Sequence, residues 1–343
     1  MDTWKQTSKQ ERNLKIFKEE LDEFLPPRIF DFHVHVFPED AFPPDHEGWS
    51  AGGHKIRHYT LDELRQDCAD LYPGRECRAL CFGTPRKELG TAKNNEYVAA
   101  GCDHKQFYPL RLIRPEDDPD AVRQDILEKR FLGFKPYLNY VDKPDPNDVE
   151  IVEMLPEGLM AVADELELLV MLHVPRKQRL ADPKNQEQVV EMAKRFPKTT
   201  IVLAHIGRAY YLKNVVGHLD NLAPLPNVYF DISMLNNWEV LEYLFAHVDP
   251  HKILYGTDLP IGIAPGKSIE INDQYTYVTP VPWELSISDD HGKLVFTAFT
   301  YEELRAIKKA VERLGLSRQF VEDLFFNNAV KLIEPVEQRI GGR

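Results

Sequence analysis

Residues 28–36 read RIFDFHVHV, a short apolar run that carries two histidines. Short runs rich in apolar and β-branched residues are typical of strands buried on both faces, as in a parallel sheet. Seven further runs of this kind follow along the chain. They are residues 78–83, 107–113, 132–138, 167–174, 200–206, 228–233 and 252–258. The sequence therefore predicts eight buried strands.

Segments with helical spacing alternate with these strands. The first begins after Thr60, with Asp62 and Glu63 in its first turn, as is typical of a helix start. The others are residues 117–129, 148–165, 185–195, 212–222 and 237–247, and residues 301–314 and 318–333 follow the last strand. Strand followed by helix, repeated eight times, predicts an α/β protein with a (β/α)8 TIM barrel of parallel strands. A doubly wound open sheet is the competing topology, but its Gly-rich loop after the first strand is absent.

One domain is expected over residues 1–343, with the barrel core at about residues 28–333, because no Gly- or Ser-rich linker interrupts the chain. Three pieces lie outside the eight units: a charged N-terminal helix, a long loop at residues 37–59 after the first strand, and residues 259–297 after the eighth. The last two follow carboxyl ends of strands, where a barrel carries its site. We expect them to form lids or substrate walls.

Composition narrows the range of partners. The chain has 42 basic and 55 acidic residues, a net charge of −13, which disfavours nucleic acid and anionic membrane surfaces as partners. Its N-terminus shows no signal peptide and no apolar run reaches the roughly 18 residues of a membrane span, so a cytoplasmic protein is expected. A homo-oligomer is compatible with the sequence. Free thiols are expected at the four cysteines, since no CxxC pair occurs among Cys68, Cys77, Cys81 and Cys102.

Four histidines and one aspartate mark the predicted strand ends. His33 and His35 are two residues apart on a strand, so their side chains point to the same face. Two hydrogen-bonded rim histidines would give the same motif, which alone does not decide. His173, His205 and Asp258 end the fifth, sixth and eighth predicted strands. So many polar groups at one level of a barrel indicate a metal site, since each buried polar group needs a partner.

With these motifs in place, the sequence resembles the amidohydrolase superfamily, in its amidohydrolase-related branch. That branch includes aminocarboxymuconate semialdehyde decarboxylase and resorcylate-type decarboxylases, alongside lactone and other hydrolases. The resemblance spans residue 29 to about residue 333 and rests on DFHVH, GFKPY, LHVP, LAHIGR, YGTDLP and NNAVKLI. It implies that His33, His35, His173 and Asp258 are metal ligands and that His205 acts beside the metal in proton transfer.

The donor set predicts which cofactor is bound and which residues are catalytic. Three imidazoles and a carboxylate suit Zn²⁺, and Mn²⁺, Fe²⁺ or Co²⁺ are also compatible. A site of this kind lowers the pKa of a water ligand to about 7. Asp258 can touch the metal and accept a proton from water, while His205 orients that water or polarises a substrate carbonyl. Asp231, which ends the seventh strand, is expected to orient a ligand histidine or to touch substrate.

Cations at strand ends predict an anionic small-molecule substrate. Lys135 ends the fourth predicted strand and is expected to anchor a substrate carboxylate. A rim lysine paired with an acid is one alternative, and the resemblance adds another, a carboxylated lysine that bridges two metal ions. Arg208, three residues after His205, is expected to support the anchor, and Arg114 is a further candidate.

Two reactions fit the same site residues. The first is metal-dependent hydrolysis of a small carboxylated or carbonyl-bearing ester, lactone or amide by activated water. The alternative is a metal-dependent nonoxidative decarboxylation, in which the same ion acts as a Lewis acid. A deoxyribonuclease of the same superfamily is disfavoured, because such enzymes place a glutamate ligand on a middle strand, where this chain has Lys135. A catalytically silent binding barrel ranks last, and metal analysis would distinguish it.

Overall fold

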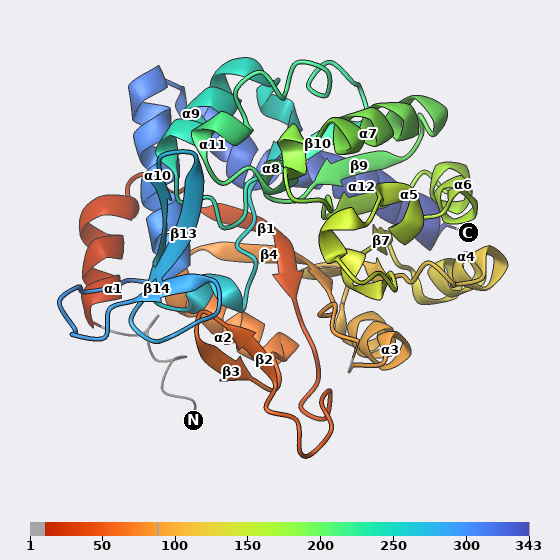
Figure 1. Ribbon diagram of the computed structural model, residues 1–343, viewed down its shortest axis with the longest axis horizontal. Coiled ribbons are helices and arrows are strands. Elements are labelled where there is room, and N and C mark those ends of the chain that lie inside the picture. Colours follow the sequence, from red (N-terminus) through yellow and green to blue (C-terminus); the bar gives the residue numbers. More distant parts are fainter. Residues whose placement is uncertain (1–10, 88, 343) are drawn as a thin grey trace.

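The computed structural model describes residues 11–87 and 89–342, with parallel strands at its centre and helices packed around them (Figure 1). The strands form two hydrogen-bonded sets, in the orders β1-β4-β5 and β11-β10-β9-β8-β7-β6. Their bounds are β1 Arg28–His35, β4 Glu76–Phe82, β5 Phe107–Pro109, β6 Arg111–Leu112, β7 Gly133–Lys135, β8 Leu169–Leu172, β9 Thr200–Leu203, β10 Val228–Asp231 and β11 Ile253–Leu254. All neighbouring pairs in these two sets are parallel.

The two sets join into one barrel. Only Leu110 separates β5 from β6, and its amide donates to the carbonyl of Cys81 on β4. At the other end, three backbone hydrogen bonds connect β1 to the residues after β11: Phe32 N to Tyr255 O (2.8 Å), Asp258 N to His33 O (2.9 Å) and His35 N to Leu259 O (2.8 Å). Counting β5 and β6 as one strand, the described residues therefore form the eight-stranded α/β barrel that the sequence predicts.

Helices cover the outside of the barrel (Figure 1). They are α2 Leu61–Leu71, α3 Thr91–Gly101, α4 Pro119–Lys129, α5 Ile151–Met154, α6 Glu157–Glu165, α7 Pro183–Arg195, α9 Trp238–His247 and α10 Phe299–Leu314. The capping box predicted at the start of α2 is present, because Thr60 and Glu63 bind each other's backbone amides. Asp182 caps α7 by accepting hydrogen bonds from the amides of Lys184 and Asn185, and it is followed by proline, which fits a first helical position.

Three helical expectations differ from the structure. The prediction of a helix at residues 212–222 is wrong. A 3₁₀ turn (η6, Leu212–Asn214) forms there instead, and Gly217 follows with φ +74°. The helix predicted at 148–165 is divided at Pro156 into α5 and α6. Helix α3 was not predicted, because amides rather than apolar residues fill much of its buried face. Asn94 and Asn95 are buried there, and Asn95 binds the backbone of Leu112.

The first and last described helical segments pack on the rest of the protein. Helix α1 (Glu11–Ile16) continues into a π-helical turn, η2 (Phe17–Leu21), and the part of the expected N-terminal helix at residues 1–10 lies outside the described residues. At the other end, α11 (Arg318–Glu322), η9 (Asp323–Asn327) and α12 (Asn328–Gly341) follow one another. The last two contact β1 and β11, so the C-terminal segment supports the closing strands. Among the described residues, no helix is long and apolar enough to cross a membrane.

Two insertions follow the carboxyl ends of β1 and β11. The first carries a hairpin of β2 (Trp49–Ala51) and β3 (His54–Ile56). The second carries a small sheet of β12 (Lys267–Ile271), β13 (Gln274–Thr279) and β14 (Ser286–Ser288). We call these segments the first lid (residues 37–59) and the second lid (residues 259–297). Short 3₁₀ turns complete the chain: η3 Leu138–Tyr140, η4 Pro146–Asp148, η5 Arg179–Ala181, η7 Pro250–Lys252 and η8 Ile261–Ile263.

Candidate metal centre and active site

Three of the predicted metal ligands form one cluster at the seam between the first and last strands. His33 and His35 project from β1 toward Asp258, which follows β11. The Nε2 atoms of the two histidines lie 3.5 and 3.2 Å from Oδ1 of Asp258, respectively. All three residues are buried. The spacing of two residues on one strand therefore places both imidazoles on the carboxylate, as the sequence predicts.

Both imidazoles are oriented by a hydrogen bond on the opposite nitrogen. Nδ1 of His33 lies 2.6 Å from Oδ2 of Asp231, and Nδ1 of His35 lies 2.9 Å from the carbonyl oxygen of Gly83. Since both partners accept hydrogen bonds, each Nδ1 is the donor and each Nε2 presents a lone pair on the side of Asp258, where the hydroxyl of Tyr137 lies 3.3 Å from Nε2 of His35. Histidines that bind metals are generally held in this way. The donor set therefore fits a divalent cation, and Asp231 orients a histidine as predicted.

His205 and His173 stand next to this cluster. The ring of His205 lies 4.7 Å from that of His33, and its Nδ1 lies 2.9 Å from the carbonyl oxygen of Ser233. The rings of His173 and His205 are 5.5 Å apart. His173 lies outside the tight groups of potential ligand atoms, but its Nδ1 is buried without a hydrogen-bond partner in the described structure. Because buried polar atoms normally have a partner, an unpartnered imidazole nitrogen next to the cluster fits a metal ligand.

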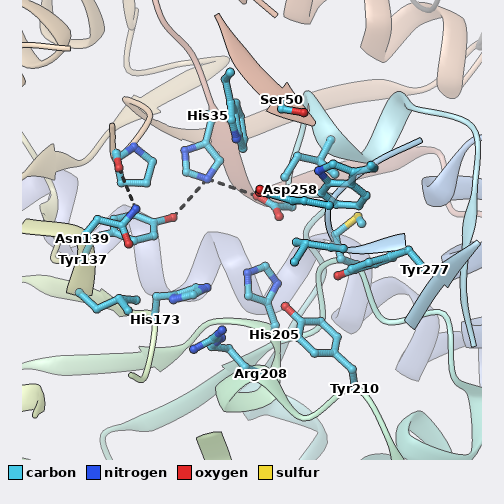
Figure 2. A pocket seen from close by; sticks show the side chains of 18 of the residues that line it. His35, Ser50, Tyr137, Asn139, His173, His205, Arg208, Tyr210, Asp258 and Tyr277 are labelled. Carbon is cyan, nitrogen blue, oxygen red and sulfur yellow. Dashed lines mark hydrogen bonds and ion pairs between the residues drawn. The ribbon is translucent and has the colours of Figure 1, made fainter. Parts of the chain in front are cut away.

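An unusual backbone turn presents His205. The four residues labelled α8 (His205–Arg208) all have positive φ, at 54°, 52°, 61° and 65°, so they form a left-handed turn. Left-handed conformation costs roughly 1–2 kcal/mol for each non-glycine residue. His205 and Arg208, three residues apart in this turn, both line the same pocket (Figure 2). The strained left-handed backbone is therefore found where His205 and Arg208 both enter the pocket.

Burial keeps the histidines neutral and their lone pairs available. It lowers the pKa of His33 to about 3, with help from the nearby Lys135 amine, and it also lowers the pKa values of His173 and His205. Burial alone would raise the pKa of Asp258, but the close contact with the His35 imidazole and the neighbouring imidazoles of His33 and His205 outweigh burial and lower it. Neutral imidazoles beside an ionised carboxylate are the protonation states that metal binding requires.

Lys135 faces the histidine cluster. It is fully buried at the end of β7, and its Nζ lies 3.4 Å from Nε2 of His33 and 4.6 Å from the centre of the Phe82 ring. Burial lowers the pKa of its amine to about 7. Lys135 does not line the pocket, and no described carboxylate lies within ion-pair distance of it. Its predicted role as a substrate anchor therefore stays a prediction.

A pocket of about 280 Å³ opens beside the cluster. Figure 2 shows His35 and Asp258 on one side of it and His173, His205 and Arg208 on the other. Aromatic side chains from both lids and from the strand ends form much of the remaining wall: Trp49, Tyr137, Tyr210, Tyr275, Tyr277 and Trp283. None of these was predicted individually. The only available signal was the position of Trp49, Tyr275, Tyr277 and Trp283 in segments expected to form lids.

The two arginines proposed as anion anchors lie in different places. Arg208 lines this pocket, and its Nη1 donates to the carbonyl oxygen of Val174 at 3.2 Å. Arg114 lines a different groove, and its Nε lies 2.7 Å from Oε1 of Glu116. The structure therefore supports Arg208 as a pocket residue and places Arg114 elsewhere.

Comparison with known proteins agrees with this architecture. The sequence profile of the amidohydrolase family matches residues 30–334, so the chain belongs to that family. No curated protein matches the sequence. Among solved structures, amidohydrolase 2 from Bifidobacterium longum subsp. infantis is similar, with a TM-score of 0.56 and 17% identity over 90% of this chain and 99% of the other.

Two further similar structures are named for different reactions, a decarboxylation and a hydrolysis. The 5-carboxyvanillate decarboxylase LigW from Sphingomonas paucimobilis has a TM-score of 0.56 at 14% identity, over 90% of this chain and 99% of its own. A probable 2-pyrone-4,6-dicarboxylic acid hydrolase from Acinetobacter baumannii, with citric acid bound, has a TM-score of 0.54 at 15% identity, over 89% and 98%. At this identity the likeness shows the fold alone. The family match over residues 30–334 identifies the protein as an enzyme of the amidohydrolase family, whose members are metal-dependent and act on small-molecule substrates.

Proposed function

We propose that this enzyme is a metal-dependent hydrolase of a small carboxylated or carbonyl-bearing ester, lactone or amide. The observation that carries the proposal is the cluster of His33, His35 and Asp258, whose imidazole lone pairs converge on one carboxylate beside an aromatic pocket. Family membership supports it. A cytoplasmic location is part of the proposal, and the four free cysteines are compatible with it.

Four residues would hold the cofactor: His33, His35, His173 and Asp258. Imidazole and carboxylate donors favour Zn²⁺, with Mn²⁺, Fe²⁺ and Co²⁺ as alternatives. When bound, a divalent ion supplies Lewis acidity and makes a water molecule nucleophilic at neutral pH. The unpartnered Nδ1 of His173 supports its inclusion, because ligation would satisfy an otherwise isolated buried nitrogen.

Two side chains of the protein would handle proton transfer: Asp258 accepts a proton from water, and His205 orients that water. Asp258 is ionised, and its carboxylate can accept a proton from the attacking water. His205 donates its Nδ1 hydrogen to the carbonyl oxygen of Ser233, so its Nε2 is an acceptor. This tautomer orients water by accepting a hydrogen bond from it. Polarising a carbonyl would instead require a protonated His205, which burial disfavours.

Metal content is the first test. The purified enzyme should contain about one divalent transition ion per chain, and His33→Ala or His173→Ala should remove most of it. The matched control is His247→Ala, because His247 is an exposed histidine on α9 that contacts the carbonyl oxygen and the ring of Tyr243 and belongs to neither group of potential ligands in the described structure. Unchanged occupancy in both site variants would refute the ligand assignment. A parent enzyme without metal or turnover would favour a silent binding barrel.

Isotope labelling distinguishes hydrolysis from the alternative, nonoxidative decarboxylation, which uses the same residues. The metal-loaded enzyme is incubated with carboxylated lactones, esters and amides in H₂¹⁸O, and with ortho-hydroxybenzoates in D₂O. Hydrolysis places one ¹⁸O in the product acid. Decarboxylation releases CO₂ and places deuterium on the carbon that carried it. Mass spectrometry of the products decides between the two reactions.

A further inference from the structure

Two arginines lie beside the second lid without an acidic partner. Arg208 lines the pocket, and its one hydrogen bond given by the structure goes to the carbonyl of Val174. Arg179, which begins η5, lies over the rings of Tyr210 and Tyr275, at 5.4 and 4.7 Å from their centres. In the described part of the chain, no carboxylate lies within ion-pair distance of either guanidinium. Nη1 of Arg179 is also buried without a hydrogen-bond partner there.

Other arginines of the described chain do have acidic partners. Arg176, only three residues before Arg179, has its Nε 2.9 Å from Oδ1 of Asp182. Arg111 binds two aspartates, Asp117 and Asp125, at 2.8 and 2.7 Å. A cation withdrawn from water without a counterion is unfavourable, and a net charge of −13 offers many acids that were not placed here. The unpaired guanidinium of Arg208, which lines the pocket, therefore indicates that an anion from outside the chain binds there. Arg179 is not among the residues that line the pocket, but it contacts two that are, Tyr210 and Tyr275.

The surroundings define the shape of that anion. The rings of Tyr210 and Tyr275 are 4.7 Å apart, and the ring of Tyr210 is 5.8 Å from that of His205. Tyr210, Tyr275 and Tyr277 all line the pocket together with Arg208, and Figure 2 shows Tyr210 close to both His205 and Arg208. Burial and the charge of Arg179 both lower the pKa of Arg208, and a bound anion would oppose both effects. Aromatic walls next to a guanidinium fit a planar carboxylate.

We propose that Arg208 is the centre of an anion subsite that binds a carboxylate of a planar, conjugated substrate, and that Arg179 supports it through Tyr210 and Tyr275. Arg208 contacts the carboxylate. Arg179 is a positioning residue, which adds positive potential and holds Tyr210 and the lid residue Tyr275 in place. The subsite deepens the proposed function and rests on it only in sharing the pocket. It also transfers the role of anchor from Lys135, which does not line the pocket, to Arg208.

Ligand binding to the metal-loaded enzyme tests the subsite without turnover. The probes are benzene-1,3-dicarboxylate and its uncharged match, benzene-1,3-dicarboxamide, followed by calorimetry. The parent should bind the dicarboxylate at least about tenfold more tightly than the diamide. Arg208→Gln and Arg179→Gln should each abolish this preference, and Arg179→Lys should restore part of it. Arg176→Gln, the matched control, should keep the preference because Arg176 is already paired.

Each other outcome counts against the subsite. A parent that does not prefer the dicarboxylate refutes the planar-carboxylate assignment. Equal weakening of both probes in Arg179→Gln would show a merely structural role. Metal content is measured on every sample. Loss of the charge preference with the ion still bound concerns the subsite, whereas a parent without metal or hydrolysis refutes the proposed function and leaves the anion binding to be judged by calorimetry.

Discussion

The contacts of one nitrogen determine what His205 can do at the residue scale. Its Nδ1 lies 2.9 Å from the carbonyl oxygen and 2.8 Å from the hydroxyl oxygen of Ser233, and that hydroxyl donates to Oδ1 of Asp231, whose other oxygen accepts from His33. Asp231 therefore orients both a predicted ligand and, through Ser233, the predicted proton-transfer group. Burial would raise the pKa of Asp231, but His33 and Ser233 outweigh burial and lower it, so the carboxylate remains an acceptor.

Substitution of His205 should separate catalysis from metal binding. We expect His205→Asn to keep the ion and to lower kcat by about 10² or more, the usual contribution of a positioned acid or base. Metal analysis and steady-state kinetics on the same preparation provide the measurement. Loss of the metal together with turnover would instead make His205 a ligand.

Glu303 is a buried acid that neither the proposed function nor the anion subsite uses. It lies on α10 with Oε2 3.3 Å from the amide of Met234, and its Oε1 has no hydrogen-bond partner among the described residues. Burial, followed by the charges of Asp31 and Asp231, raises its pKa well above the usual 4.5. The folded protein thus retains this proton at pH values where the unfolded chain has released it.

Replacement of Glu303 by glutamine should change how stability depends on pH. Above pH 4.5 and below its raised pKa, the folded state binds more protons than the unfolded state, so stability falls as pH rises, by up to about 1.4 kcal/mol per pH unit. Glu303→Gln cannot ionise and still offers an oxygen to Met234. Its stability relative to the parent should therefore increase from pH 5.5 to pH 8.5 in denaturant titrations. A difference that is constant with pH would contradict a raised pKa.

At the scale of elements, the buried strands were predictable and their connections were not. Runs such as TIVLAHI are apolar because both faces of the barrel strand are covered, and this leaves a signal in composition. The segment after His205 offers no such signal. Its spacing is helical, yet Gly217 adopts φ +74° and donates its amide to the hydroxyl of Tyr243, a contact 26 residues away. Tertiary partners of this kind cannot be read from local spacing.

The site shows the same division between local and tertiary information. Spacing on one strand predicts that His33 and His35 share a face, and the strand ends predict that Asp258 meets them. Spacing does not reveal whether Lys135 points into the pocket or toward His33, because both directions begin at the same strand end. The aromatic walls were equally hidden, since they depend on how the two lids fold back over the barrel.

The left-handed turn at residues 205–208 supplies an element-scale prediction. Gly207 has φ +61°, and a Cβ there would lie 3.0 Å from Cδ1 of Leu180. We expect Gly207→Ala to cost about 1 kcal/mol or more in unfolding free energy and to lower activity further, because the strained turn carries His205 and Arg208. Gly315→Ala is the matched control, with φ +62° and open space around the added atom. It should share the loss of stability and retain kcat. Equal activity losses in both variants would contradict a specific role of the turn.

The whole molecule depends on the seam where β1 meets the residues after β11. The donors of the predicted centre come from both sides of that seam, with His33 and His35 on β1 and Asp258 beyond β11. Among the described residues, three backbone hydrogen bonds cross it, between Phe32 and Tyr255, His33 and Asp258, and His35 and Leu259. Thr257 adds two more hydrogen bonds, to the carboxylate of Asp31 on β1. An ion bound by these donors would connect the first and last strands directly. Metal binding should therefore stabilise barrel closure and not only catalysis.

Hydrogen exchange after metal removal measures this contribution. Ligand linkage gives about 2.7 kcal/mol of stabilisation when the free ion is at a hundred times its dissociation constant. Chelation should lower the melting temperature and increase exchange first in peptides that cover residues 29–36 and 253–259. Peptides covering residues 169–172 and 200–204, on strands paired far from the seam, should change less. His33→Ala should show no further response to chelator, since it has already lost the ion. A uniform rise in exchange, or an equal response in His33→Ala, would show that the ion does not connect the two ends of the barrel.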